Sequence, residues 1–211
     1  MKKMGLQNMK ITVVDYESGN LRSVIQALRY AEIDPIVSGN PDQILSADAL
    51  ILPGVGSGNA AMKALEQKQL TGAIREFIGS GRPFMGICLG LQLLMDITDE
   101  GGGVECLSVI RGTVERLPSE YKVPHMGWNQ VVINKEHNIM RGINPSAYFY
   151  FAHSYYSVPA DSNVVLGTTS YGIDFCSILV RDNVFATQFH PEKSGSVGLQ
   201  IYKNFIQNAI E

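Results

Sequence analysis

A short apolar segment that ends in Gly-Ile-Cys-Leu-Gly constrains the fold of this chain more than any other feature of its sequence. Residues 83–88 read as a buried strand, and residues 89–95, LGLQLLM, read as the start of a helix. Cys88 at the junction lies between Gly86 and Gly90, and G-x-C-x-G is the cysteine form of the turn that lifts a nucleophile above a parallel sheet. The pattern predicts a strand–turn–helix unit of an α/β protein, with a thiol at the end of the strand.

The segments that precede this unit repeat the same alternation. Strands are predicted at residues 10–15, 35–37 and 49–52, and helices from residue 20 and at residues 60–70 and 74–78. The links between them are short. Strands and helices that alternate in this way form a parallel sheet covered by helices on both faces.

The second half of the chain has a different pattern. Between residues 109 and 184, short strands alternate with Gly, Asn and Pro turns, and we expect them to add antiparallel strands to the parallel sheet. A last strand at residues 184–189 precedes an amphipathic helix at residues 197–210. Because no repeat or linker interrupts the chain, we expect residues 1–211 to form one domain: an α/β fold with a flavodoxin-like, doubly wound mixed sheet.

Composition narrows the possible functions. Contents of 45% hydrophobic and 18% charged residues exclude a disordered or fibrous chain. The net charge of -3 and the scattered basic residues predict no nucleic-acid partner. No apolar run reaches the roughly 18 residues of a membrane span, and the opening KKMGLQNM lacks the core of a signal peptide. We therefore expect a cytoplasmic protein without membrane contact, for which Met4 and Met9 are alternative starts.

The cysteines and histidines show no metal-binding pattern. The three cysteines lack C-x-x-C spacing, which predicts a reducing compartment with neither disulfides nor a zinc site. Cys106 and Cys176 have no catalytic context and read as buried, inert thiols. No ligand spacing connects the four histidines. We expect no metal and no cofactor.

A base for Cys88 is available at the end of the last predicted strand. In an extended chain His190 and Glu192 point the same way, so Glu192 can accept from the ring of His190 while its other nitrogen faces Cys88. The carboxyl ends of parallel strands share one edge of the sheet, where residues far apart in sequence meet. The sequence therefore predicts a Cys-His-Glu triad.

Backbone donors are expected beside this triad. Gly54, Val55 and Gly56 follow the strand at residues 49–52, and the two glycines allow the Val55 amide to aim at a substrate oxygen. The Leu89 amide, at the start of a helix, is a second donor. Together they predict an oxyanion hole.

These motifs resemble those of the class I, or triad, glutamine amidotransferases. PGVG, GICLGLQ and HPEKS occur in the order seen in that family. The opening DYESGN, PHMGWN at residues 124–129 and AHSYY at residues 152–156 are similar to the glutaminase subunits of imidazole glycerol phosphate synthase. The resemblance runs from residue 10 to residue 208. Glu17 departs from it, since the family usually has glycine there (DYGxGN).

The resemblance implies a reaction and the residues that perform it. Cys88 attacks the side-chain amide of glutamine, His190 delivers a proton to the leaving ammonia, and Glu192 orients His190. The resulting thioester is hydrolysed to glutamate. The glutamine-binding residues that the resemblance implies are Gly54, Val55, Gly56, Leu89, Gln92, His153, Ser154 and Tyr155. Taken alone, His125 and His153 read as hydrogen-bonded histidines of the core or of a pocket wall.

A partner is implied as well, because free ammonia is protonated and disperses in water. In the family the partner is a (β/α)8-barrel cyclase subunit, which forms a heterodimer with the glutaminase and adds the ammonia to a phosphorylated ribonucleotide intermediate of histidine biosynthesis. Trp128, Tyr150 and Lys193 match interface positions. The peptide between Gly54 and Val55 can flip, so we expect the oxyanion hole to be complete only when the partner binds its ligand.

Three other interpretations stay open at this point. A paralogous glutaminase subunit would supply another synthase, such as one of bacterial surface-sugar amidination, through the same triad. A γ-glutamyl peptide hydrolase would use the same fold, but PHMGWN and HPEKS argue against it. A non-enzymatic interaction protein would retain the cysteine of the turn without the triad, and His190 with Glu192 argues against that.

Overall fold

The computed structural model describes residues 9–17 and 20–210, so Met4 and the Ser18-Gly19 pair of the DYESGN motif lie outside the described residues. The strands of its largest sheet are β1 (Ile11–Val14), β2 (Ile36–Ser38), β3 (Ala49–Gly54), β4 (Phe84–Cys88), β9 (Val132–Ile133), β12 (Val165–Ser170), β13 (Asp174–Arg181) and β14 (Val184–Thr187). Their order is β2-β1-β3-β4-β14-β13-β12-β9. The first five strands pair in parallel, and β13, β12 and β9 continue the sheet antiparallel. This mixed sheet, with the flavodoxin-like order in its parallel half, confirms the predicted fold class.

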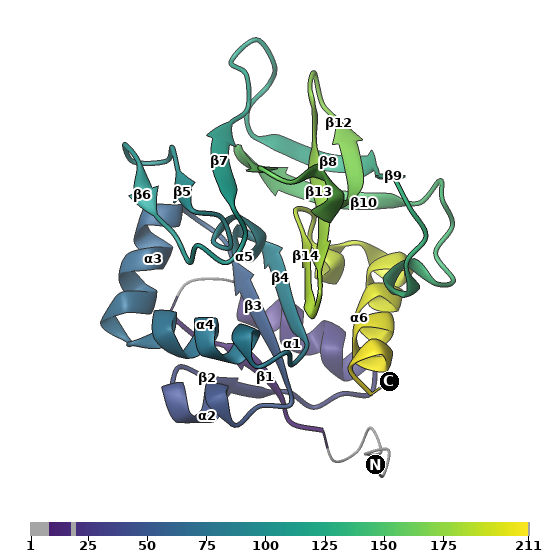
Figure 1. Cartoon of the computed structure of the whole chain (residues 1–211). Coiled ribbons are helices and arrows are strands. Elements are labelled where there is room, and N and C mark those ends of the chain that lie inside the picture. The colour runs from purple at the N-terminus through teal and green to yellow at the C-terminus, as the bar shows by residue number, and fades with distance from the viewer. Residues whose placement is uncertain (1–8, 18–19, 211) are drawn as a thin grey trace.

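Helices cover both faces of the parallel strands (Figure 1). They are α1 (Leu21–Tyr30), α2 (Pro41–Leu45), α3 (Gly58–Gln67), α4 (Leu70–Gly79), the one-turn α5 (Leu89–Gln92) and α6 (Gly195–Ile210). Val13 of β1 shares one buried cluster with residues of α1 and α6, whereas Val14 shares the other with residues of α2, α3 and α4. Successive strand residues therefore point into opposite cores, which explains why these strands are largely apolar.

The antiparallel strands are only partly as predicted. We expected all of them to extend the parallel sheet, but only β9, β12 and β13 do so. Two smaller sheets hold the others. One pairs β8 (His125–Gln130) with β10 (Tyr148–His153). The second, in the order β11-β7-β5-β6, holds β7 (Gly112–Arg116) and β11 (Tyr155–Pro159) together with two short strands that precede the predicted region: β5 (Ile97–Thr98), which pairs with β7 in parallel, and β6 (Val104–Glu105). The chain changes sheet at Ser154, the single residue between β10 and β11. Alternation of apolar residues predicts a strand but does not identify the strand that pairs with it.

Two helical predictions also differ from the structure. The helix after Cys88 ends at Gln92 instead of continuing to residue 95, because the amides of Leu94 and Met95 donate to the carbonyl oxygens of Leu91 and Gln92, the tighter i→i−3 bonds of a turn. The short helix α2 was not predicted. Its signals are present, since Asn40 caps it by accepting from the amides of Asp42 and Gln43, and Pro41 stands at its first position.

The departure at Glu17 has a backbone basis. Glu17 has φ of +64°, in the left-handed region that glycine occupies without strain. Its amide donates to Asp15 Oδ1 at 2.9 Å, and its carboxylate pairs with Lys68 Nζ at 2.9 Å. Glu17 thus adopts the left-handed conformation that the family's glycine would take, and its contacts with Asp15 and Lys68 hold it there.

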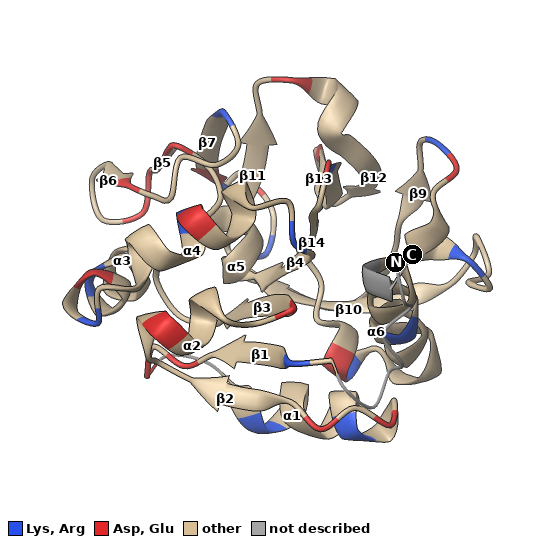
Figure 2. Cartoon of the chain, turned by 60° about the horizontal axis from the view of Figure 1, so that its bottom comes forward, with Lys and Arg blue, Asp and Glu red and all other residues tan. Residues whose placement is uncertain are grey.

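The charged side chains are mixed on the face shown in Figure 2. Lys and Arg are interspersed with Asp and Glu along α1 and the neighbouring segments. Within residues 9–17 and 20–210, no helix is both long and apolar enough to cross a membrane.

Candidate active site

The turn at Cys88 has the predicted geometry. Cys88 has φ of +54° and ψ of −105°; it is the last residue of β4 and directly precedes the first residue of α5. A Cβ atom at Gly90 would lie 1.9 Å from the carbonyl oxygen of Leu52 in β3, and one at Gly86 would lie 2.8 Å from the carbonyl oxygen of Gly90. Only glycine fits at either position, because backbone atoms on both sides approach too closely for a side chain. This packing holds the strained turn and its thiol at the edge of the sheet.

His190 and Glu192 meet at the same edge. His190 Nδ1 lies 2.8 Å from Glu192 Oε1, and both side chains are 2% exposed. The expected contact is present, but our reason for it is wrong. Residues Pro191–Lys193 form a 3-10 turn, η4, instead of an extended chain. The turn, with Pro191 in its first position, folds the carboxylate back onto the ring.

The protonation of His190 follows from its neighbours. Burial lowers the pKa of His190, but the negative charge of Cys88 and a hydrogen bond with it, followed by the hydrogen bond and charge of Glu192, outweigh burial and raise the pKa to about 10. His190 therefore carries a proton on each ring nitrogen at neutral pH, one shared with Glu192 Oε1 and the other available at Cys88. The pair is arranged as a nucleophile and its proton donor.

A cavity of about 210 Å³ opens beside Cys88. The predicted glutamine-binding residues that line it are Val55, Gly56, Leu89, Gln92, His153, Ser154 and Tyr155. Gly54 is not among the lining residues. It pairs with Cys88 across β3 and β4, and a Cβ atom there would lie 2.8 Å from the Leu89 Cβ. Gly54 therefore allows β3 to approach the start of α5.

Several residues of this site were missed by the sequence analysis. Glu100, Pro124, Met126 and Ala152 line the cavity as well. Gln188, which is fully buried, donates through Nε2 to Cys88 Sγ at 3.6 Å. The signal for Gln188 is its place directly after the last strand, at the edge where we already expected His190.

His125 and His153 are buried and hydrogen-bonded, as expected, and they contact each other. His125 Nδ1 lies 3.0 Å from His153 Nε2, and His153 Nδ1 lies 2.9 Å from the carbonyl oxygen of Tyr155. Burial lowers the pKa of His125 to about 4. Burial lowers the pKa of His153 to about 3; the hydrogen bond to the Tyr155 carbonyl oxygen opposes this shift, and repulsion from protonated His125 and His190 adds to it. Both rings are neutral at pH 7, so each has one donor nitrogen and one acceptor nitrogen.

Two of the predicted interface residues, Trp128 and Tyr150, lie on one face of the β8–β10 ribbon, and the third, Lys193 of η4, lies beside them. Tyr150 and Trp128 pair across the two strands, and their ring centroids are 5.9 Å apart at 79°. Lys193 Nζ lies 5.8 Å from the centroid of Tyr150, a cation–π contact. Trp128 is 56% exposed, so it is a surface residue and not an aromatic of the core.

The remaining cysteines differ from Cys88. Burial and then the charge of Asp96 raise the pKa of the Cys106 thiol to about 11, and burial raises that of Cys176 to about 12. Both are free and buried, as predicted. In the part of the chain that the structure describes, no group of three or more His, Cys, Asp or Glu side chains is arranged to hold a metal ion.

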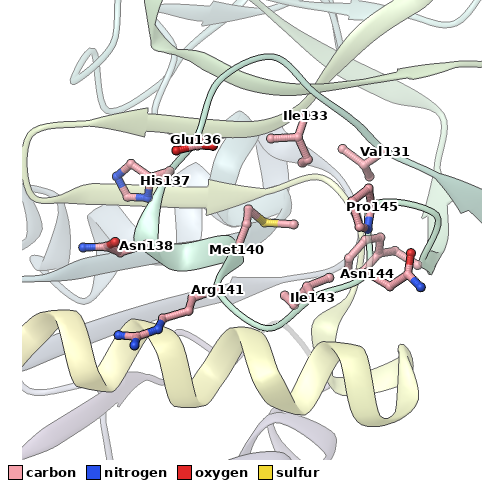
Figure 3. Close-up of a pocket in the computed structure, with 11 residues that line it drawn as sticks. Val131, Ile133, Glu136, His137, Asn138, Met140, Arg141, Ile143, Asn144 and Pro145 are labelled. Carbon is pink, nitrogen blue, oxygen red and sulfur yellow. The ribbon is translucent and has the colours of Figure 1, made fainter.

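A second cavity, of about 330 Å³, lies away from Cys88 between β9 and the loop that contains η2 (Asn138–Met140). Figure 3 shows the apolar side chains of Val131, Ile133, Met140 and Ile143 around it. None of the predicted site residues lines this cavity.

Comparison with known proteins identifies the class to which this fold and site belong. The family model described as Glutamine amidotransferase class-I matches residues 12–209. The chain belongs to the class I glutamine amidotransferase family, and the resemblance seen in its motifs is confirmed.

Within the class, the chain is similar to proteins named Imidazole glycerol phosphate synthase subunit HisH. The one from Dehalococcoides mccartyi is 46% identical over 200 residues, which cover 95% of this chain and 98% of that protein. The one from Methanosarcina acetivorans is 48% identical over 201 residues, covering 94% and 98%. The one from Moorella thermoacetica is 49% identical over 195 residues, covering 92% and 93%.

Solved structures of lower identity share the fold. A structure described as glutamine amidotransferase has a TM-score of 0.75 at 20% identity, with 94% of this chain and 98% of that chain covered. PurLQS from Thermotoga maritima has a TM-score of 0.76 at 18% identity, with 95% and 98% covered. At these identities the likeness concerns the fold alone.

Proposed function

We propose that this chain is the glutaminase subunit of an imidazole glycerol phosphate synthase. It hydrolyses glutamine to glutamate and ammonia and passes the ammonia to a cyclase subunit in histidine biosynthesis. The proposal depends on one observation: His190 is hydrogen-bonded to both Cys88 and Glu192, and Cys88 faces a cavity that most of the predicted glutamine-binding residues line. The HisH relatives, 46–49% identical over most of the chain, support this acceptor rather than that of a paralogue.

The reaction begins with attack by Cys88 on the side-chain amide carbon of glutamine. As the tetrahedral intermediate forms, negative charge develops on the amide oxygen, and the backbone amides of Val55 and Leu89 are our candidates to bind it. The C–N bond then breaks while His190 gives a proton to the leaving nitrogen. The products of this half-reaction are ammonia and a thioester on Cys88.

A water molecule completes the cycle. His190, now neutral, takes a proton from the water as it attacks the thioester carbon, and the C–S bond breaks to release glutamate and the Cys88 thiolate. Glu192 holds the ring in position through both halves and stabilises its protonated form, since its carboxylate accepts from Nδ1 at 2.8 Å.

We assign the partner surface to the exposed face of the β8–β10 ribbon. Met126 on this face is 64% exposed and also lines the cavity beside Cys88, so the ribbon connects the surface with the site. A cyclase subunit seated on Trp128, Tyr150 and Lys193 would cover the cavity and receive ammonia away from solvent. The cytoplasmic location expected from the three unpaired cysteines stays a prediction.

This function is tested by measuring glutamate release by the purified chain. The chain is assayed alone and then with the cyclase subunit of the same genome and its nucleotide ligand. We expect stimulation of about 100-fold or more, because completing an oxyanion hole by one donor has an effect of this size. If a cyclase active on ammonium salts gave no stimulation, the paralogue with another acceptor would be favoured. If the chain alone were as fast as the liganded complex, the flip of the peptide between Gly54 and Val55 would be excluded.

A further inference from the structure

The sulfur of Cys88 has two polar neighbours besides His190: the carbonyl oxygen of Ala152 at 3.9 Å, which can only accept, and the side-chain amide of Gln188. Gln188 Nε2 lies 3.6 Å from Sγ, and the side chain of Gln188 is fully buried. Its backbone amide donates to the carbonyl oxygen of Ser177 in β13 at 2.9 Å, which fixes the start of the side chain. The side-chain amide of Gln188 has an oxygen end that accepts and a nitrogen end that donates, so its effect on the sulfur depends on which end faces it.

The orientation of the Gln188 amide follows from a neighbouring carbonyl group. Gln92 Nε2 lies 2.7 Å from the carbonyl oxygen of Tyr155, and because that oxygen only accepts, the nitrogen end of Gln92 must face it. The same nitrogen lies 3.1 Å from Gln188 Oε1 and gives it the second proton. The oxygen end of Gln188 is thus directed to Gln92, and the donor end is left for Cys88 Sγ.

A second set of hydrogen bonds holds the same carbonyl group from the other side. His153 Nδ1 donates to the Tyr155 oxygen at 2.9 Å, so its Nε2 is an acceptor and takes the proton of His125 Nδ1. His125 Nε2 then accepts from Asn129 Nδ2 at 3.3 Å. One backbone oxygen therefore sets the direction of every hydrogen bond from Asn129 to the sulfur.

We propose that Gln188 is a further residue of the catalytic machinery, whose amide donates to Cys88 Sγ and stabilises it as a thiolate. The donor is fixed before substrate binds and gains strength when the sulfur is charged, since hydrogen bonds to ionised acceptors are the stronger ones. With His190 it surrounds the sulfur with two donors from the segment that follows β14. This inference rests on the proposed role of Cys88 as the nucleophile.

The test uses the complex of this chain with its cyclase subunit and iodoacetamide as the probe of Cys88. Gln188→Met keeps the length of the side chain and removes the donor, and Gln188→Glu keeps the acceptor for Gln92 but turns a carboxylate oxygen toward the sulfur. Gln207→Met, on the exposed side of α6, is the matched control. Circular dichroism of each variant and its co-elution with the cyclase subunit in size-exclusion chromatography report that the variant is folded and assembled.

We expect Gln188→Met to lower the rate of Cys88 alkylation at pH 7 by about 10-fold, and Gln188→Glu to lower it further. The kcat for glutamine should fall by a similar factor while KM changes by less than about twofold. The deficit in alkylation should shrink as the pH is raised, because hydroxide then ionises the thiol without the donor. A residue that only fills space would not produce this dependence on pH.

Two results would overturn the inference and leave the proposed function standing. One is an unchanged rate of alkylation in both variants. The other is a rise in KM alone, which would mean that Gln188 only positions Gln92 in the wall of the substrate cavity. If Gln188→Met did not fold, Gln188→Glu, which is nearly identical in shape, would decide. An unreactive Cys88 in a wild-type complex that does not hydrolyse glutamine would overturn the proposed function and this inference with it.

Discussion

Three of the four histidines lie in or beside the site, and their surroundings give them different charges. His190 contacts two acidic groups and is protonated at neutral pH. His125 and His153 are equally buried but contact each other and a carbonyl oxygen, so both are neutral. Burial acts on all three in the same direction, and the neighbouring charges decide the outcome. A proton donor and a neutral hydrogen-bond pair thus lie side by side.

The neutral pair should make the protein sensitive to acid. In the unfolded chain both histidines have a pKa near 6.5, whereas in the folded chain their pKa values are about 4 and about 3. Between about pH 6.5 and pH 4 the unfolded chain binds more protons, so the free energy of unfolding falls as the pH is lowered through this range. For His125 alone the loss amounts to about 3 kcal/mol.

Urea unfolding of wild type and His125→Gln between pH 8 and pH 4 measures this loss. Glutamine keeps a donor for His153 but does not titrate, so the variant should lose less of its stability between pH 6.5 and pH 4. The difference between the two proteins should be constant above pH 7, where both histidines of the wild type are neutral. Parallel curves over the whole range would contradict the assignment of a neutral pair.

At the scale of elements, the parallel half of the sheet and the turn at Cys88 are predictable from sequence. Strands buried on both faces are apolar throughout, and their ends carry glycines and polar residues, so residues 49–56 and 83–90 indicate the edge where the site lies. The triad and most of the cavity wall follow from that edge together with the family motifs.

Other parts of the site depend on contacts that no local pattern reports. The pairing of β8 with β10 brings His125 opposite His153, although the two residues are 28 positions apart. The role of Gln188 depends on Gln92 and on the carbonyl oxygen of Tyr155. Gln92 ends α5, Tyr155 begins β11 and Gln188 follows β14, so the three residues come from different parts of the chain. Such neighbours become visible only when the strands are assembled.

Gly90 provides a direct test of the packing that holds the turn. In Gly90→Ala the new Cβ would lie 1.9 Å from the carbonyl oxygen of Leu52, so α5 must move away from β3. We expect the free energy of unfolding to fall by about 3 kcal/mol and glutaminase activity to be lost. Gly72→Ala is the matched control, since it lies within α4 with open space around it and should gain up to about 1 kcal/mol. Equal stability of the two variants would refute the close approach.

At the scale of the whole molecule, the site lies at one edge of the main sheet, and the β8–β10 ribbon places an exposed apolar face beside it. Met126, Trp128 and Tyr148 on this ribbon are 64%, 56% and 53% exposed. Large exposed side chains gathered on one face are typical of interaction sites, and tryptophan is enriched among the residues that contribute most to binding. This face is continuous with the cavity through Met126, as the proposed partner surface requires.

Trp128→Ala should weaken binding of the cyclase subunit by about 30-fold or more, because a central tryptophan commonly contributes about 2 kcal/mol or more. Glutamine hydrolysis by the isolated chain should not change. Tyr30→Ala is the control, since Tyr30 is 72% exposed and ends α1, a helix that Figure 1 shows away from the β8–β10 ribbon. Isothermal titration of each variant with the cyclase gives the comparison. Equal affinity of both variants would place the interface elsewhere.

The measurement that tests the central claim most directly compares two nitrogen sources in the complex of Cys88→Ala with the cyclase subunit. Synthesis of imidazole glycerol phosphate is followed with glutamine and, separately, with ammonium salts. If Cys88 is the nucleophile of a glutaminase subunit, synthesis from glutamine is abolished and synthesis from ammonium is retained at the wild-type rate. Retention of synthesis from glutamine would contradict this role of Cys88, and failure of Cys88→Ala to bind the cyclase subunit would make Cys88 a structural residue.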